Sequence, residues 1–394
     1  MNYDIIKTLN LKYELIDKEK SFSFYNEKGI RIVELFLLDQ NPRICPRCNE
    51  SKVFIISSRI NTIKHASIAE NKILVNIHRR VYKCECCGHV YVQTSPIVEE
   101  NRHISIEKDM LILHDLRDST NTFKKLAEKY DVSPTYISNL FDKKVDIKRG
   151  VLPQVLCIDE IYSKKLSKYH YLCVLYSPQR KAIIDILESR RKDFLIDFFA
   201  HIPGKEKQNV QYVSIDMWDN YRQIVKLCLP SAYICVDSFH VIKQLNFHFN
   251  KVRIRVMKRY DELKKAYYLK EEYREFNLCA DNPEDAAEKL EDLILKFKRS
   301  GISEYIPFWK LLQNWKKEII NSFTRINGFR ISNGPIEKAN AEIRKLIKVS
   351  YGCSNFVRFK NRVMYVINDN EPILGTRKKH TNKRNFKPRG KYKK

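Results

Sequence analysis

The chain has 394 residues, more than one ordinary hydrophobic core accommodates, so we expect two or three domains. A hydrophobic content of 43% with only 10 glycines and 13 prolines is typical of a soluble globular protein in which disorder is confined to the ends. The 73 Lys and Arg residues exceed the 47 Asp and Glu residues, and the net charge of +26 favours a polyanionic partner such as nucleic acid; a lysine-favouring genome is the alternative explanation.

The amino-terminal segment carries no secretory signal, because residues 1–20 lack a basic stretch followed by an apolar one. Apolar runs such as Val33–Leu38 fall short of the roughly 20 residues that cross a bilayer. We therefore expect a cytoplasmic, nucleoid-associated protein without membrane contact. In that compartment the 11 cysteines are reduced and are metal ligands or core residues.

Two cysteine pairs define residues 1–100 as a zinc-binding domain. The motifs Cys45-Pro-Arg-Cys48 and Cys84-Glu-Cys-Cys87 enclose 35 residues, which include strand-like alternation over 73–83. Four thiolates on two tight turns are typical of a closed structural zinc site of the zinc-ribbon type. We assign Cys45, Cys48, Cys84 and Cys87 as the ligands, since the spacing of Cys86 does not suit either turn. A redox Cys-x-x-Cys is the alternative, but such motifs occur singly.

Residues 101–150 are predicted to form a helix-turn-helix domain. Helical spacing over 122–130 and 135–141 is interrupted at Asp131-Val-Ser-Pro134, where Ser133 caps the second helix. The second helix presents polar groups suited to the major groove of DNA, and two lysines follow it. The residues predicted to contact DNA are Ser133, Thr135, Tyr136, Ser138, Asn139, Lys143 and Lys144. A packing role for this helical pair is the alternative.

Residues 151–375 are predicted to form a mixed α/β domain. Short apolar runs at 155–159, 169–176, 182–187, 210–215 and 232–236 indicate three strands of a meander, followed by two strands that alternate with helices. Helical patterns occupy residues 238 to about 325 and 335–347. Residues 376–394 form a predicted disordered basic tail, because 375–394 hold ten Lys or Arg and no acid. The tail either contacts DNA phosphates or serves solubility.

Acidic residues are placed where this domain could bind metal. Asp159 and Asp216 each end an apolar run, so their carboxylates would share one edge of the sheet and repel each other unless divalent cations lay between them. Glu337 falls in the first turn of a later helix, on one face with Asn340 and Arg344. Taken singly, each acid has an ordinary alternative, as a turn former or as a carboxylate that complements the helix dipole.

The order of these acids resembles the ISL3 family of bacterial insertion-sequence transposases. The most specific matches are Ile158-Asp-Glu160, Asp237-Ser-Phe-His-Val241 and Asn333-Gly-Pro-Ile-Glu337, and the resemblance runs from the cysteine pairs to Tyr351–Phe356. It implies a multidomain α+β protein with a ribonuclease-H-like catalytic domain interrupted by an all-helical insertion at 241–330. It further implies a DDE triad of Asp159, Asp216 and Glu337, supported by Asp237 and His240. Pro335 departs from the residue that many relatives have after the Asn-Gly pair.

The resemblance implies an enzyme that binds transposon-end DNA and catalyses strand cleavage and strand transfer with Mg²⁺, or Mn²⁺ in its place. The terminal inverted repeats and target DNA are the expected partners, and bringing two ends together implies a homodimer. Arg344, Lys345 and Lys348, beside the glutamate, are expected to hold DNA phosphates. Two alternatives are a non-catalytic DNA-binding regulator derived from a transposase and another nuclease of the same fold, such as a junction resolvase.

Overall fold

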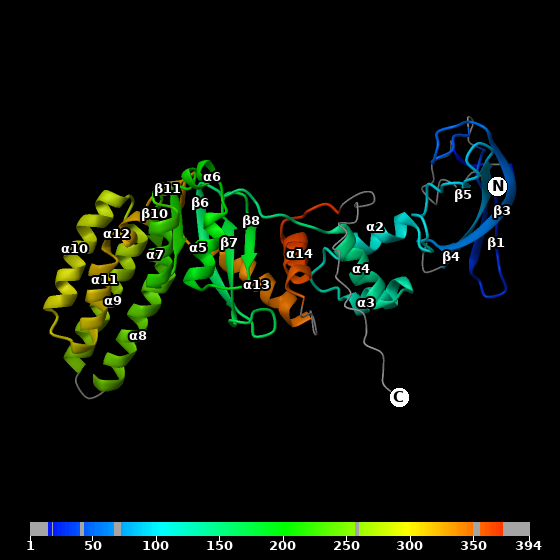
Figure 1. Cartoon of the computed structure of the whole chain (residues 1–394). Coiled ribbons are helices and arrows are strands. Elements are labelled where there is room, and N and C mark those ends of the chain that lie inside the picture. Colours follow the sequence, from blue (N-terminus) through cyan, green and yellow to red (C-terminus); the bar gives the residue numbers. More distant parts are fainter. Residues whose placement is uncertain are drawn as a thin grey trace, which may run out of the picture. The chain divides into compact units, whose positions relative to one another are not determined.

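The protein is described by a computed structural model that covers residues 15–17, 19–39, 43–66, 72–256, 260–349 and 355–372. The chain divides into two compact units, which are labelled by element in Figure 1. Unit 1 comprises residues 1–145 with 372–394, and unit 2 comprises residues 146–371. The predicted basic tail at 376–394 lies outside the described residues. No helix among the described residues is long and apolar enough to cross a membrane.

Unit 1 begins with a twisted sheet. Its strands are β1 (Phe22–Tyr25), β2 (Arg31–Phe36), β3 (Val53–Lys64), β4 (Ile73–Cys84) and β5 (Val90–Val92), in the order β1-β2-β4-β3 with β5 paired to β4. The strand predicted at 73–83 is present, and its alternation holds over 73–77, where Ile73, Val75 and Ile77 are buried and the residues between them are half-exposed; residues 78–81 are all half-exposed. These three side chains form the core of the sheet with Val33 and Leu35.

Three short helices complete unit 1: α2 (Ile106–Asp115), α3 (Phe123–Tyr130) and α4 (Pro134–Lys144). Each begins at a hydroxyl side chain that accepts a backbone N–H, and Ser133 caps α4 as its sequence predicts, with Pro134 in the first turn. Asp131 ends α3 in the left-handed region at φ 51°, which turns the chain sharply into α4. Leu126, Ile137 and Leu140 are buried between the helices.

Unit 2 is built on a mixed five-stranded sheet. The strands are β6 (Val155–Tyr162), β7 (Tyr171–Ser177), β8 (Ala182–Leu187), β9 (Tyr212–Ile215) and β10 (Tyr233–Val236), in the order β10-β9-β6-β7-β8. Strands β6, β7 and β8 form an antiparallel meander, whereas β9 and β10 run parallel to β6. Parallel neighbours need crossover helices, which here are α5 (Lys192–Ala200), α6 (Gly204–Gln208) and α7 (Asp219–Cys228).

Helices cover both faces of this sheet. Leu156 and Ile158 of β6 pack with Leu195 of α5 and Ile224 of α7 on one face. The alternate residues of β6, including Cys157, face α13 (Gly334–Val349) and α14 (Phe356–Ile367) on the other. Strand β6 is therefore apolar on both sides, as is usual for a central strand.

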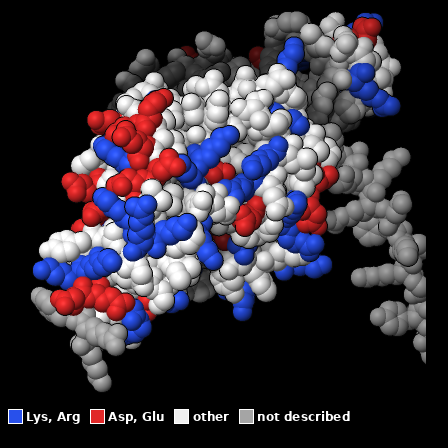
Figure 2. All heavy atoms as spheres, turned by 90° about the vertical axis from the view of Figure 1, so that its left-hand side faces the viewer, with Lys and Arg blue, Asp and Glu red and all other residues white. Residues whose placement is uncertain are grey.

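A helical segment separates β10 from α13. It contains α8 (Ser238–Val256), α9 (Tyr260–Cys279), α10 (Pro283–Arg299), the 3₁₀ turn η2 (Ser303–Tyr305), α11 (Ile306–Asn314) and α12 (Lys316–Asn321), and ends in a hairpin of β11 (Arg325–Ile326) and β12 (Phe329–Arg330). Figure 1 shows these helices beside the β10 edge of the sheet, and Asn321 of α12 donates to the Ile234 carbonyl of β10. In Figure 2, Lys and Arg side chains spread over most of the helical face, and acidic side chains gather most densely at its upper left.

Candidate active site

Three aspartates lie level with one another at one edge of the unit 2 sheet. The parallel register pairs Cys157 of β6 with Ser214 of β9, so Asp159 and Asp216, each two residues further, are neighbours. The register of β9 with β10 pairs Ile215 with Val236, which brings Asp237 beside Asp216. Adjacent strands lie about 4.8 Å apart, so the three carboxylates form a row. Strand β6 does not end at Asp159 as its apolar run suggests, because pairing with β7 continues to Tyr162.

Helix α13 is attached to this row through hydrogen bonds donated by two asparagines. Asn340 Nδ2 donates to Asp159 Oδ2 at 2.6 Å, and Asn340 is completely buried. Asn333, which precedes the helix, donates its backbone N–H to Asp237 Oδ1 at 3.3 Å and its Nδ2 to the Ile158 carbonyl at 3.4 Å. The amino-terminal half of α13 is therefore fixed against the middle of β6 and the end of β10.

Several oxygen atoms of the row lack a hydrogen-bond partner among the described residues. Burial raises the pKa of Asp159, and it raises the pKa of Asp216 to about 6, with repulsion from Glu160 and Asp159 adding to the effect on Asp216. Burial likewise raises the pKa of Asp237. Asp216 Oδ1, Asp237 Oδ2 and the Oδ1 atom of Asn340 are buried without a hydrogen-bond donor. Hard oxygen atoms that are buried, crowded and unpaired are the donor set that Mg²⁺ and Mn²⁺ bind.

Glu337 is on the same helix as Asn340, three residues earlier, so the two side chains share a face. Its side chain is exposed, whereas Asn340 is buried. Within the described ranges, only the four cysteines at 45–87 bring three or more His, Cys, Asp or Glu ligand atoms within 4.8 Å of one another. The structure thus brings Asp159 and Asp216 together and places Glu337 one turn from the Asp159 contact, but does not gather all three carboxylates at metal-binding distance.

The predicted supporting pair Asp237 and His240 lies at the same edge. Asp237 is 2% exposed and directly precedes α8, and His240 is in the first turn of that helix, with its Nε2 atom 3.9 Å from Asp237 Oδ2. Burial has the largest effect on Asp159, Asp216 and Asp237 and raises the pKa of each. The electrostatic interaction with His240 lowers the pKa of each by a smaller amount. The electrostatic effect of His240 thus extends to all three aspartates, and its nearest carboxylate contact among the described residues is Asp237.

Sequence reasoning missed a cationic residue behind the row. Arg190 forms an ion pair with Glu160 and lies between two aromatic rings, 3.8 Å from the centroid of Tyr171 and 4.6 Å from that of Trp218. The Tyr221 hydroxyl donates to the other oxygen of Glu160 at 3.1 Å. Glu160 follows Asp159 directly, and Trp218 is two residues after Asp216, so both are near the predicted site in the sequence. Arg190 is distant from both in the sequence, and its contacts with them depend on the fold.

The basic residues predicted beside Glu337 are available at the surface. Arg344, Lys345 and Lys348 are exposed on α13, and Arg344 is near enough to Asp159 to lower its pKa, against the larger effect of burial. Lys345 pairs with Glu342 at 2.6 Å. Arg344 and Lys348 have no ion-pair partner among the described residues, so they keep their charge available for an anion.

The four predicted zinc ligands converge at one end of the unit 1 sheet. The Sγ atoms of Cys45 and Cys87 lie 3.6 Å apart and those of Cys48 and Cys84 lie 3.5 Å apart, and all four fall within 4.8 Å of one another. Such spacing fits the edges of a tetrahedron around one zinc ion. Cys86 is exposed and outside the cluster, as its spacing predicts.

The predicted DNA-contact residues of α4 divide into two groups. Thr135 and Asn139 are exposed on α4, as is the capping residue Ser133. Tyr136 instead donates its hydroxyl to the buried Asp109 at 2.6 Å, and Ser138 donates to the Thr135 carbonyl at 3.0 Å. Lys143 and Lys144 both pair with Glu99, and the Lys144 side chain is only 8% exposed. Of the predicted contact residues, the exposed ones are therefore the small polar residues between the cap and the middle of α4.

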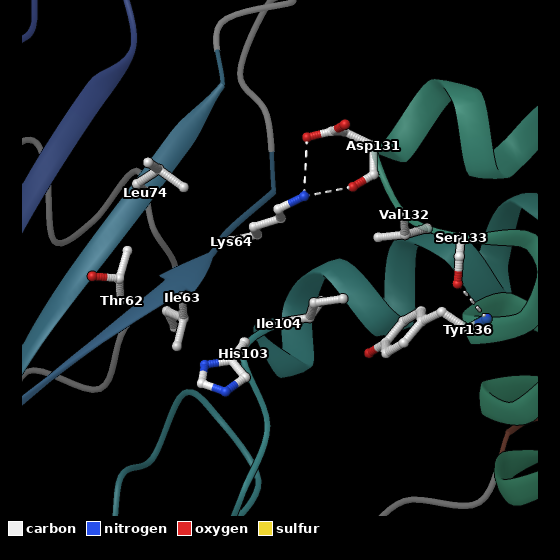
Figure 3. Close-up of a pocket in the computed structure, with 10 residues that line it drawn as sticks. All are labelled: Thr62, Ile63, Lys64, Leu74, His103, Ile104, Asp131, Val132, Ser133 and Tyr136. Carbon is white, nitrogen blue, oxygen red and sulfur yellow. Dashed lines mark hydrogen bonds and ion pairs between the residues drawn. The ribbon is translucent and has the colours of Figure 1, made fainter.

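The turn between α3 and α4 is held to the sheet of unit 1. Figure 3 shows Lys64 of β3 donating to both the carbonyl and the carboxylate of Asp131, at 2.9 and 3.1 Å, with Ser133 and Tyr136 beyond them. Lys72 adds a second ion pair to Asp131 at 3.4 Å. A pocket of about 400 Å³ lies between the strand residues and the turn. The sheet that carries the cysteine cluster and the helical pair therefore belong to one unit.

The structure thus combines a mixed sheet that carries three aspartates at one edge with a separate unit that contains the cysteine cluster. Comparison with protein families assigns the chain: the model of the ISL3 family of DDE transposases, described as "Transposase", matches residues 156–262 and 257–363. Because these matches cover more than half of the chain, the protein belongs to the ISL3 transposase family. No curated protein gives a significant match.

Proposed function

We propose that this chain is the active transposase of an insertion sequence and uses Asp159, Asp216 and Glu337 as its catalytic triad. The observation that carries the proposal is the pairing of Asp159 with Asp216 on neighbouring parallel strands, under a helix that carries Glu337 and is tied to Asp159 through Asn340. The strand order, a three-stranded meander followed by two parallel strands, is the arrangement expected of a ribonuclease-H-like domain.

The buried oxygens of the row fit a divalent cation, and Asp159, Asp216 and Glu337 would hold it, with Asp237 next to them. When bound, Mg²⁺ or Mn²⁺ would activate water or a DNA 3′-hydroxyl and stabilise the leaving oxygen of the phosphodiester. The residues of the chain have separate tasks: Asn340 orients the Asp159 carboxylate, Asn333 orients Asp237, and Arg344 and Lys348 hold the phosphates of the DNA.

In this proposal unit 1 recognises the transposon ends. The cysteine cluster holds a structural zinc ion that fixes the end of the β3–β4 hairpin, and α4 presents Thr135 and Asn139 to the major groove. The terminal repeats and the target DNA are the partners, and two chains act together because two ends must be joined. The helical segment between β10 and α13 is the insertion of the catalytic domain.

The test is a plasmid that carries the gene's flanking ends, incubated with the purified chain and Mg²⁺. Asp159→Asn, Asp216→Asn and Glu337→Gln are each expected to abolish cleavage and joining and to leave binding of end DNA nearly intact. Glu342→Gln, on the same helix, and Asp219→Asn, exposed at the start of α7, are the matched controls and should remain active. Cleavage at the wild-type rate by all three triad variants would refute the assignment, and binding without cleavage by the wild type would favour the regulator.

A further inference from the structure

Unit 1 contains a second basic site, apart from α4, in the form of a cleft in the sheet. The cleft has a volume of about 480 Å³ and lies between the first cysteine turn at 44–46, the strands β3 and β4, the segment 91–94 and the loop 100–103. Four of its lining residues are basic: Arg59, Arg79, Arg102 and His103. Glu100 is the one acidic residue among those that line it.

Two of the arginines lie directly opposite each other on neighbouring strands. The antiparallel register pairs Arg59 of β3 directly with Arg79 of β4. Like charges in directly opposite positions destabilise a sheet, because their side chains project from the same face within a few ångströms. Further along the same face, Ile63 and Val75 are also paired and are buried in the core. The arginine pair therefore stands where the pattern of the sheet would place an apolar pair.

Neither arginine forms an ion pair among the described residues, although Glu100 in the same cleft interacts electrostatically with Arg79. No carboxylate lies within 4 Å of the guanidinium groups of Arg59, Arg79 or Arg102 in the part of the chain that the structure describes, whereas Lys143 and Lys144 both pair with Glu99. Arg79 Nε donates to the Gln93 carbonyl at 2.6 Å, which fixes the guanidinium plane at the cleft.

The cleft is next to the helix-turn-helix. Arg102 lies 5.8 Å from the ring centroid of Tyr136, which is on α4. His103, which Figure 3 shows between β3 and α4, lines this cleft and also the pocket beside the α3–α4 turn. An anion bound in the cleft would thus lie within the same unit as the helix that we propose to enter the major groove.

We propose that this cleft binds the phosphodiester backbone of duplex DNA, with Arg59 and Arg79 holding phosphates beside the segment contacted by α4. The proposal rests on the proposed function, since it presumes that unit 1 binds DNA. Planar guanidinium groups suit phosphate oxygens because they donate parallel hydrogen bonds, and a phosphate between Arg59 and Arg79 removes their mutual repulsion. The unit would then hold DNA at two places, with the cleft adding affinity and α4 adding sequence selectivity.

The experiment measures how salt weakens DNA binding by the full-length chain. A labelled duplex from the DNA that flanks the gene is titrated at several salt concentrations with wild type and with Arg59→Gln/Arg79→Gln. Each lost phosphate contact lowers the slope of log K against log salt by about 0.9, so the double variant should lose roughly 1.8. Lys20→Gln/Lys28→Gln removes the same charge from exposed positions near the β1 edge and should keep the wild-type slope. Zinc content and melting temperature verify that each variant is folded.

A second variant distinguishes a phosphate site from a structural effect. Glu100→Gln removes the acidic residue of the cleft and is expected to tighten DNA binding, which a merely structural role would not produce. Equal slopes in the arginine variant and in the wild type, or equal losses in both double variants, would overturn the cleft proposal while leaving the catalytic triad untouched. If the wild type bound no duplex at all, both proposals would fall.

Discussion

Replacing Asp216 with Asn tests whether the carboxylate row is built to hold a cation. Burial and the neighbouring carboxylates raise the pKa of Asp216 from 3.8 to about 6 in the folded protein without metal. Because folding raises this pKa, the folded protein binds the Asp216 proton more tightly than the unfolded chain does. The stabilisation from the protonated carboxyl group is fully present below pH 3.8 and is lost as the pH rises through about 6. At about 1.4 kcal/mol for each tenfold change in proton binding, the charged Asp216 costs the metal-free fold about 3 kcal/mol at neutral pH.

Asp216→Asn is therefore expected to raise the free energy of unfolding at neutral pH in EDTA by up to about 3 kcal/mol, or the melting temperature by roughly 6–12 °C. The same variant should lose most of the stabilisation that Mg²⁺ gives the wild type, which is about 2.7 kcal/mol at a hundredfold excess over the dissociation constant. Thermal unfolding in EDTA and in Mg²⁺, repeated across the acidic pH range, measures both effects.

The control is Asp197→Asn on α5, whose carboxylate is 78% exposed and should change stability by less than about 0.5 kcal/mol. A variant at position 216 that is less stable than the wild type in EDTA at neutral pH would show that burial is not the dominant cost. Equal stabilisation of variant and wild type by Mg²⁺ would show that Asp216 does not bind the cation.

Three further experiments, with four substitutions, test unit 1. Cys84→Ser should remove the zinc ion, measured as metal content, and Cys86→Ser should keep it, since the Cys86 sulfur lies outside the cluster. Tyr136→Phe leaves the buried Asp109 without its donor and should cost about 1–3 kcal/mol in denaturant unfolding; an unchanged midpoint would contradict the contact. Lys144→Gln should lower stability but leave the salt dependence of DNA binding unchanged, because its amine is paired and buried; a reduced slope would place it on DNA.

The sequence alone determined the features that depend on local pattern. The two Cys-x-x-Cys turns predicted which four cysteines lie together, because a short turn carries both of its sulfurs to one place. Ser133 and Pro134 predicted the start of α4, and the apolar runs predicted the five strands of unit 2, since caps and periodicity act over a few residues. The matches around Asp159, Asp237 and Glu337 were sufficient to suggest the family.

The tertiary structure decided which of these side chains meet. The contact of Asn340 with Asp159 spans 181 positions of sequence, and the opposition of Arg59 and Arg79 follows from a strand register with an irregularity between Ile55 and Ser57. Neither follows from residue periodicity, because a one-residue shift of register exchanges the two faces of a strand. The ion pair between Lys144 and Glu99 could not be predicted from the sequence either. A sequence shows which residues are charged, but the burial and pairing of a charge depend on packing between distant segments.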